Sequence, residues 1–239
     1  IGSINQHSEQ RQKRPALPTL YPRAMIGTEG SAVIRCYDRS SRRAGATAAL
    51  LFCAALAVYV ATLAPSVAAV FDDSLEFQLV TYQLAIAHPT GYPLFTLLGW
   101  LFTRLPLGEV AYRVNLMTAL FGGTTVALTY LLGRALARQS DADATSPQWP
   151  GEAGAILGAL ALAVSPVVWS QATLAEVYTL NATIVAAILL VLMPMDCTTG
   201  RVVPVKRDAL ADRAGQTELR RHFTLLASLL GLGLAHHRT

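Results

Sequence analysis

Residues 44–71 read AGATAALLFCAALAVYVATLAPSVAAVF, without a charged side chain, and residues 72–76 then read DDSLE. The run from Ala44 to Leu63 has 20 residues, which is enough for a helix to cross a hydrocarbon core of about 30 Å. Ala64-Pro65 then ends that helix. Carboxylates are costly to hold at the end of a membrane span, so such a cluster indicates a functional site. The stretch therefore predicts a transmembrane helix followed by an acidic site at one membrane surface.

The composition is that of an integral membrane protein. Of 239 residues, 53% are hydrophobic and 14% are charged, whereas about a quarter of the residues in a soluble domain are charged. Sixteen of the 19 Lys and Arg residues lie in three segments: eight in residues 1–43, two at Arg134 and Arg138, and six in residues 201–221. This clustering is typical of cytoplasmic loops and excludes a basic nucleic-acid-binding face.

The charge pattern predicts five membrane spans, at about residues 44–63, 114–133, 153–175, 177–195 and 223–239, with a kink at Pro166. The polar residues 1–43 are predicted to form a disordered cytoplasmic arm before this transmembrane domain of residues 44–239. A cleaved signal peptide is the alternative, but the first run is longer than a signal h-region. We expect a multi-pass protein of the bacterial inner membrane with a cytoplasmic N-terminus. Because the chain starts without Met and stops within an apolar run, we also expect it to be truncated at the C-terminus.

Residues 65–112 are predicted to form one extracytoplasmic loop that lies against the membrane. Four apolar residues at helical spacing predict a short amphipathic helix: Phe77, Val80, Leu84 and Ala87. The apolar run from Tyr92 to Thr103 has 12 residues, which favours an interfacial or re-entrant helix over a span. The predicted fold class is therefore all-α, a polytopic transmembrane bundle with short interfacial helices in one loop.

Several short motifs follow one another along the chain: DSLE at 73–76, HPTGYPLF at 88–95, YRVN at 112–115, WSQ at 169–171, AEVYTLN at 175–181 and GLGLAHHRT at 231–239. Their order resembles a family of transmembrane O-mannosyltransferase-like membrane proteins of the GT-C glycosyltransferase class, long filed as a domain of unknown function. The resemblance covers about residues 50–239. This chain has Asp72 and Leu75 where the family usually has glycine, and Thr90 where it usually has proline.

The resemblance implies the N-terminal part of a GT-C-type inverting glycosyltransferase that carries out O-mannosylation. It would move a mannose-like hexose to an acceptor hydroxyl on a protein or glycan. Nucleotide sugars are absent outside the cytoplasm, so the donor there is expected to be a polyprenyl-phosphate sugar. Two other classes remain open: an ion-coupled transporter, whose acids would bind a cation or relay protons, and a non-catalytic polytopic scaffold. Acids at one interface rather than at the midplane argue against the transporter.

Asp73 and Glu76 are the candidate catalytic residues, with Asp73 as the base that deprotonates the acceptor hydroxyl. The same spacing fits a capping box, in which Asp73 caps a helix and Glu76 bonds back to it. Both roles remain open at this point. Eight residues are candidates for substrate binding: His88, Tyr92, Arg113, Glu176, Tyr178, His236, His237 and Arg238.

Arg113 and the histidines are the candidates for stabilising the donor phosphate, because a guanidinium matches phosphate oxygens in a fork. The ordinary alternatives also remain: His88 bonding its own turn, Arg113 snorkelling to lipid headgroups, and Glu176 pairing with Arg113.

No cofactor and no metal site are predicted, although the sequence leaves a divalent metal ion open. His236 and His237 are adjacent, and adjacent residues of a helix do not face one site. Three cysteines are too widely spaced for a zinc site or a disulfide framework: Cys36, Cys53 and Cys197. The expected partners are membrane lipid, the lipid-linked donor and the acceptor, with no nucleic acid.

Overall fold

A computed structural model describes residues 29–67, 72–89, 91–140, 149–193 and 213–236, and every regular element in these ranges is a helix. The predicted all-α class is therefore confirmed. The helices are α1 (Glu29–Ala61), α2 (Asp72–Gln83), α3 (Pro93–Thr103), α4 (Val110–Ser140), α5 (Trp149–Ala163), α6 (Pro166–Thr173), α7 (Tyr178–Val191) and α8 (Arg213–His236).

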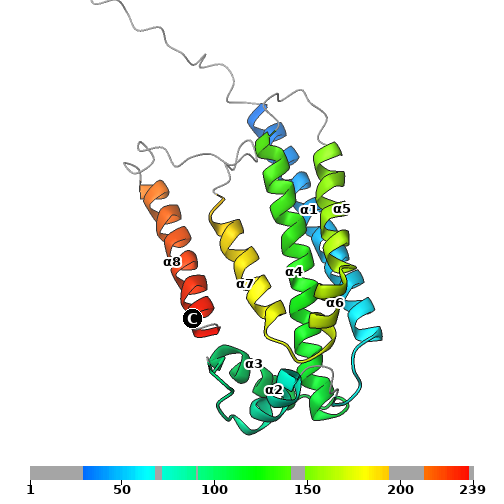
Figure 1. The fold of residues 1–239 in the computed structure, drawn as a ribbon. Helices are drawn as coiled ribbons and strands as arrows, with labels where there is room; N and C mark the ends of the chain where they lie inside the picture. Colours follow the sequence, from blue (N-terminus) through cyan, green and yellow to red (C-terminus); the bar gives the residue numbers. More distant parts are fainter. Residues whose placement is uncertain (1–28, 68–71, 90, 141–148, 194–212, 237–239) are drawn as a thin grey trace, which may run out of the picture.

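Helix α4 is the centre of the bundle and packs against α1, α5, α6 and α7 (Figure 1). Helix α8 lies on the far side of α7 and also contacts α3. The short helices α2 and α3 pack on each other and on the N-terminal half of α4, across one end of the bundle (Figure 1). The candidate site residues of the predicted loop are therefore gathered at that end.

Among the described residues, two helices are long and apolar enough to cross a membrane, Arg42–Ala61 within α1 and Val110–Arg138 within α4. Helices α5 and α6 make a third candidate if they are taken as one span bent by 58°. The bend falls directly before Pro166, so the predicted kink is confirmed. The predicted fourth and fifth spans correspond to shorter apolar helices, α7 and the Phe223–His236 part of α8, so the count of five spans stays a prediction.

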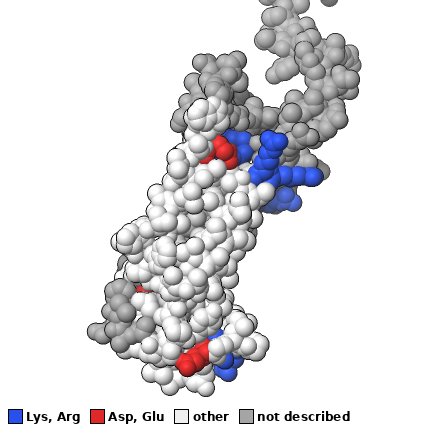
Figure 2. All heavy atoms as spheres, turned by 90° about the vertical axis from the view of Figure 1, so that its right-hand side faces the viewer, with Lys and Arg blue, Asp and Glu red and all other residues white. Residues whose placement is uncertain are grey.

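The side chains of the bundle are distributed as expected for a multi-pass membrane protein. On the face shown in Figure 2, charged side chains lie toward the two ends, and a broad uncharged surface separates them. Helix α4 shows the same pattern along its length, with Arg113 near its start, Arg134 and Arg138 near its end, and no charge between them.

The N-terminal boundary of the bundle differs from the prediction. Helix α1 begins at Glu29, whereas residues 29–43 were expected to belong to a disordered arm. The apolar periodicity starts only at Ala44, so the polar first turns of this helix carry no core-facing pattern that the sequence could reveal. The rest of the predicted arm, residues 1–28, lies outside the described residues.

Close helix packing in the centre depends on small residues. A Cβ atom added at Gly122 would lie 2.8 Å from the Cβ of Ala172, so α6 approaches α4 as closely as its backbone permits. A Cβ atom at Gly123 would lie 3.3 Å from the backbone oxygen of Phe52 in α1. Glycine at both positions therefore permits this close packing.

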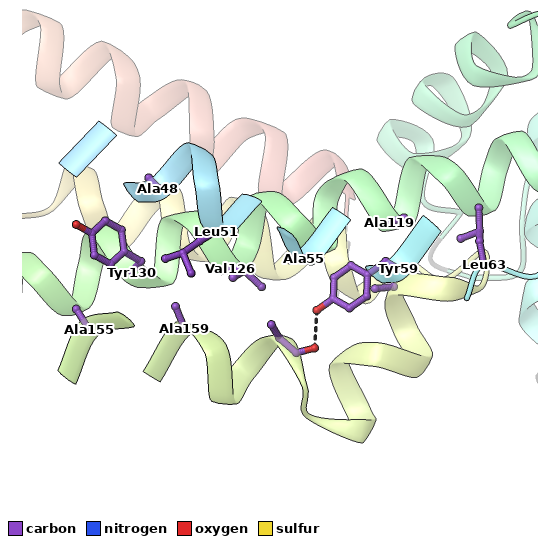
Figure 3. Close-up of a cluster of buried hydrophobic side chains, with 12 residues drawn as sticks. Ala48, Leu51, Ala55, Tyr59, Leu63, Ala119, Val126, Tyr130, Ala155 and Ala159 are labelled. Atoms are coloured by element: carbon purple, nitrogen blue, oxygen red, sulfur yellow. Dashed lines mark hydrogen bonds between the residues drawn. The ribbon is translucent and has the colours of Figure 1, made fainter. Parts of the chain in front are cut away.

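The break between α5 and α6 is held by a tyrosine of α1. Helix α5 ends at Ala163 and α6 starts at Pro166, so the carbonyl of Ala163 at the break has no partner in a continuous helix. The fully buried Tyr59 donates its hydroxyl to the backbone oxygen of Ala163 at 2.8 Å (Figure 3). The Tyr59 ring also packs edge-on against Trp169 of α6, with 5.9 Å between ring centroids. The bent pair is thereby fixed against α1.

The two short helices agree with the sequence in part. The run from Tyr92 to Thr103 becomes α3, which confirms a short helix there. Helix α2 begins before the predicted Phe77 and ends at Gln83, because Leu84 adopts a φ of 53°. Leu84 is consequently 46% exposed and is not on the buried face, so its placement by helical periodicity was wrong.

Candidate functional site

The first turns of α2 and the turn after that helix bring three candidate residues together. Glu76 accepts a hydrogen bond from the backbone nitrogen of His88 at 2.6 Å, and its other oxygen lies 2.7 Å from the ring Nδ1 of His88. Both side chains are about one third exposed. Asp73, one turn earlier on α2, is exposed. The two predicted catalytic carboxylates are therefore adjacent, but only Glu76 is held by His88.

The turn that carries His88 has a backbone suited to its sequence. The backbone nitrogen of Gly91 donates to the His88 oxygen at 2.7 Å, and Gly91 adopts a φ of 87° that a side chain would strain. Tyr92 also has a positive φ, of 41°, and its ring packs against Phe77 at 5.3 Å and against His88 at 5.5 Å between centroids. These ring contacts hold the imidazole over the start of α2.

Glu176 also contacts the first turn of α2, although it comes from the turn between α6 and α7. It is 3% exposed in the short turn between α6 and α7, and its Oε1 accepts a 2.6 Å hydrogen bond from the buried hydroxyl of Ser74. Burial raises the pKa of Glu176 above its ordinary value, and the negative charge of Asp73 raises this pKa further. The hydrogen bond from Ser74 and the proximity of His88 lower the pKa in part.

The turn from Leu174 to Val177 is a meeting point of several helices. The backbone oxygen of Leu174 accepts a hydrogen bond from Thr118 of α4 at 2.7 Å. The ring Nε2 of His236, at the end of α8, lies 3.0 Å from the backbone oxygen of Val177. Since that carbonyl can only accept, Nε2 carries the proton. His236 is 1% exposed and its ring lies 6.1 Å from that of Tyr92, so α8 closes one side of the site.

Arg113 serves the loop between α3 and α4. Its guanidinium donates to three backbone oxygens, those of Leu107 at 2.5 Å, Thr103 at 2.6 Å and Gly108 at 2.9 Å. The bond to Thr103 satisfies the last carbonyl of α3, and the bonds to Leu107 and Gly108 close the loop onto α4. Phosphate binding by Arg113 stays a prediction, and a phosphate would compete with these three carbonyls for the same donors.

The contacts of Glu76 and Glu176 bear on two alternatives, the capping box and the pairing of Glu176 with Arg113. Helix α2 begins at Asp72, so Asp73 lies within its first turn, and the carboxylate of Glu76 bonds to His88 rather than back to the helix start. The structure thus does not show the capping box. Glu176 bonds to Ser74 rather than to Arg113.

The structure brings together six of the predicted residues: Asp73, Glu76, His88, Tyr92, Glu176 and His236. Tyr178 starts α7 beside the turn but is 57% exposed. His237 and Arg238 lie outside the described residues. Sequence reasoning missed Ser74, because a lone serine between two acids has no pattern that marks it.

Asp73, Glu76 and His88 could also hold a metal ion, since each offers one ligand atom and these atoms lie within 4.8 Å of one another. Carboxylate oxygen and imidazole nitrogen both suit divalent transition metals. Glu76 and His88 already bond to each other, so a cation would have to replace that bond.

Sequence comparisons place the chain among known proteins. Residues 73–239 match the model of the Protein O-mannosyl-transferase TMEM260 N-terminal domain, and the match begins at Asp73, the first residue of the site. The chain belongs to this family. The resemblance inferred from the ordered motifs is thereby confirmed, and the residues matched include every candidate site residue.

Two relatives have informative names. Over 132 residues, the chain is 37% identical to mouse Protein O-mannosyl-transferase TMEM260, a match that covers 55% of this chain and 17% of the relative. Over 158 residues, it is 28% identical to Protein O-mannosyl-transferase tmem260 of Dictyostelium discoideum, covering 65% of this chain and 18% of the relative. The chain thus spans under a fifth of the length of these relatives. No solved structure matches the chain.

Proposed function

We propose that this chain is the N-terminal part of a GT-C-type O-mannosyltransferase, with its active centre at the end of the bundle where α2 and α3 lie. The observation that carries the proposal is the exposed Asp73 beside the Glu76–His88 pair, in a chain that belongs to an O-mannosyl-transferase family. The proposed donor is a polyprenyl-phosphate mannose, and the proposed acceptor is a hydroxyl group of a protein or glycan at the extracytoplasmic face.

In the proposed reaction, the carboxylate of Asp73 accepts the proton of the acceptor hydroxyl. The acceptor oxygen then attacks the anomeric carbon from the side opposite the phosphate. The bond between that carbon and the phosphate oxygen breaks, and the polyprenyl phosphate leaves with the bonding electrons. Displacement from the opposite side inverts the anomeric configuration. General-base assistance of this kind contributes about 10²–10⁴-fold to such rates.

The exposure of the three acids supports different roles for them. A base must reach a substrate hydroxyl within hydrogen-bond distance, and Asp73 is the exposed acid of the three. Glu76 is engaged with His88, and Glu176 is buried against Ser74. Glu76 and His88 would then hold the turn at the edge of the site, where His88, His236, His237 and Arg238 are the candidates for countering the charge of the departing phosphate.

The arrangement also bears on the transporter alternative. Ion-coupled transporters bind their ions near the bilayer midplane, commonly where helices are interrupted. Here Asp73, Glu76 and Glu176 lie together at one end of the bundle, beyond the uncharged stretches of α1 and α4. That position fits a reaction at the membrane surface better than a path through the membrane.

The experiment that tests this proposal is a transfer assay with the full-length protein in membranes. Polyprenyl-phosphate mannose and a mannose nucleotide are offered separately, each with radiolabelled sugar and a mixture of membrane-protein acceptors. We expect label to reach the acceptor from the lipid donor only. Transfer from the nucleotide by purified protein without lipid would contradict the donor, and transfer from neither would contradict the activity.

A further inference from the structure

The contact between Ser74 and Glu176 joins two parts of the chain that are 102 residues apart. Ser74 has 0% exposure and Glu176 has 3%, so water does not compete for their 2.6 Å hydrogen bond. Ser74 is also the direct neighbour of Asp73 in the first turn of α2. Any shift of Ser74 would therefore move the proposed base with it.

The partner of Ser74 is itself firmly held. The turn that carries Glu176 is bonded to α4 through Thr118 and Leu174, and to α8 through His236 and Val177. The backbone nitrogen of Ala64, after α1, donates to the oxygen of Thr173 at 3.3 Å. Four described residues in a row in this turn are buried: Leu174, Ala175, Glu176 and Val177. The turn is consequently a fixed reference point for whatever bonds to it.

We propose that Ser74 and Glu176 form a positioning pair, in which the buried hydrogen bond fixes the first turn of α2, and with it Asp73, on the turn between α6 and α7. The catalytic consequence rests on the function proposed above. Placement of a reacting group matters strongly, because a misplacement of about 1 Å can lower a rate by about 10²-fold. Ser74 acts through Asp73 in this account and does not touch the substrate.

The charges around Glu176 are compatible with a structural hydrogen bond. Asp73 on α2 and His88 after α2 act on Glu176 in opposite directions, and burial favours its neutral form. Glu76 is paired with His88, and His236 of α8 faces the backbone of the same turn. The hydroxyl of Ser74 can donate to a carboxylate or to the carbonyl oxygen of a carboxylic acid. The pair therefore does not require one charge state of Glu176.

The test compares Ser74→Ala with Thr81→Val in the full-length protein. Both substitutions delete a fully buried hydroxyl from α2, but Thr81 donates only to carbonyls of its own helix, those of Phe77 and Gln78. Amide hydrogen exchange at residues 76–78, whose N–H groups bond to the carbonyls of the first turn of α2, reports anchoring of that turn. The values of kcat and KM for sugar transfer report positioning. We expect Ser74→Ala to speed exchange there at least tenfold and to lower kcat by up to about 10²-fold, with KM changed less than threefold. Thr81→Val should leave both readouts within threefold of the parent.

A second pair of variants covers the case in which Ser74→Ala fails to fold. Glu176→Gln keeps an oxygen that accepts from Ser74 and should keep slow exchange at residues 76–78 of α2, whereas Glu176→Ala should lose that protection. Unchanged exchange in Ser74→Ala, or equal exchange in the two Glu176 variants, would overturn the anchoring. Faster exchange with an unchanged kcat would overturn the positioning role. A parent protein that transfers no sugar would contradict the proposed function, whereas the exchange data would still decide whether the pair anchors α2.

Discussion

Glu76 binds His88 through both carboxylate oxygens, one 2.6 Å from the backbone nitrogen and the other 2.7 Å from the ring Nδ1. This double contact distinguishes two carboxylates that the sequence presents as equivalent. Glu76 fixes the turn between α2 and α3, while Asp73 on the same helix stays exposed. The Nδ1 of His88 is occupied by this contact, so Nε2 is the ring nitrogen that is not engaged with Glu76.

We predict that Glu76→Ala loosens this turn and lowers stability. The substitution removes two charge-assisted hydrogen bonds, but the pair is about one third exposed, so a loss of about 1–2 kcal/mol is expected. Thermal unfolding of purified protein in detergent measures it. Gln83→Ala, an exposed position at the end of the same helix, serves as the control and should change Tm little. Equal Tm values for the two variants would show that the contact does not stabilise the turn.

Tyr59→Phe is predicted to destabilise the bend between α5 and α6. It deletes only the hydroxyl that bonds the Ala163 carbonyl, and a buried carbonyl left without a partner costs about 1–3 kcal/mol. The same substitution at Tyr82, which is 51% exposed, is the matched control. A lower Tm for Tyr59→Phe than for Tyr82→Phe is the expected result. If the two variants unfold together, the bend does not depend on this hydrogen bond.

The pKa of Glu176 predicts a pH dependence of stability with a defined sign. Burial raises this pKa in the folded state, so the folded protein favours the neutral acid. The resulting stabilisation is complete below the unfolded pKa and is lost as the pH rises through the folded pKa. Glu176→Gln is neutral throughout. The difference between the Tm of the parent and the Tm of Glu176→Gln should therefore fall with rising pH. A difference that grows with rising pH would contradict a raised pKa of Glu176 in the folded state.

The orientation of the bundle stays a prediction and can be tested by cysteine labelling. Leu107, in the loop between α3 and α4, is 46% exposed. A membrane-impermeant maleimide applied to intact cells should label Leu107→Cys, because that loop is predicted to be extracytoplasmic. Cys36 and Cys197, which are predicted to be cytoplasmic, should react only after the cells are opened. Labelling of Cys36 or Cys197 in intact cells would indicate the opposite orientation of the bundle.

Local features of this fold were predictable from the sequence. The length of the run from Tyr92 to Thr103 indicates a short helix, and Pro166 indicates a bend, because each depends on residues close together in the chain. Leu84 shows the limit of such reasoning. It continues the apolar spacing of α2, but the positive φ at that residue ends the helix and turns the side chain outward.

The site itself was predictable only in composition. The motifs named most residues that the structure brings together, but their pairing depends on how distant segments pack. The bond between Ser74 and Glu176 spans 102 residues, and no local pattern reports such a contact. The residue type and position of Arg113 likewise suggested a phosphate ligand. In the structure its guanidinium donates to three backbone carbonyls.

Asp73 is the proposed general base, and its replacement by asparagine tests that role. Asn is nearly isosteric with Asp, and Asp73 is exposed in the first turn of α2, so Asp73→Asn should preserve the fold. It cannot accept the hydroxyl proton, and loss of a general base lowers turnover by about 10²–10⁴-fold. Asp72→Asn removes the same charge from the neighbouring residue and is the control.

The measurement is single-turnover transfer of mannose from the polyprenyl-phosphate donor, with both variants at matched amounts of full-length protein. We expect Asp73→Asn to lose at least about 10²-fold in rate, while Asp72→Asn stays within a few-fold of the parent. Equal rates for Asp73→Asn and Asp72→Asn would contradict it and would move the role of base to Glu76 or Glu176.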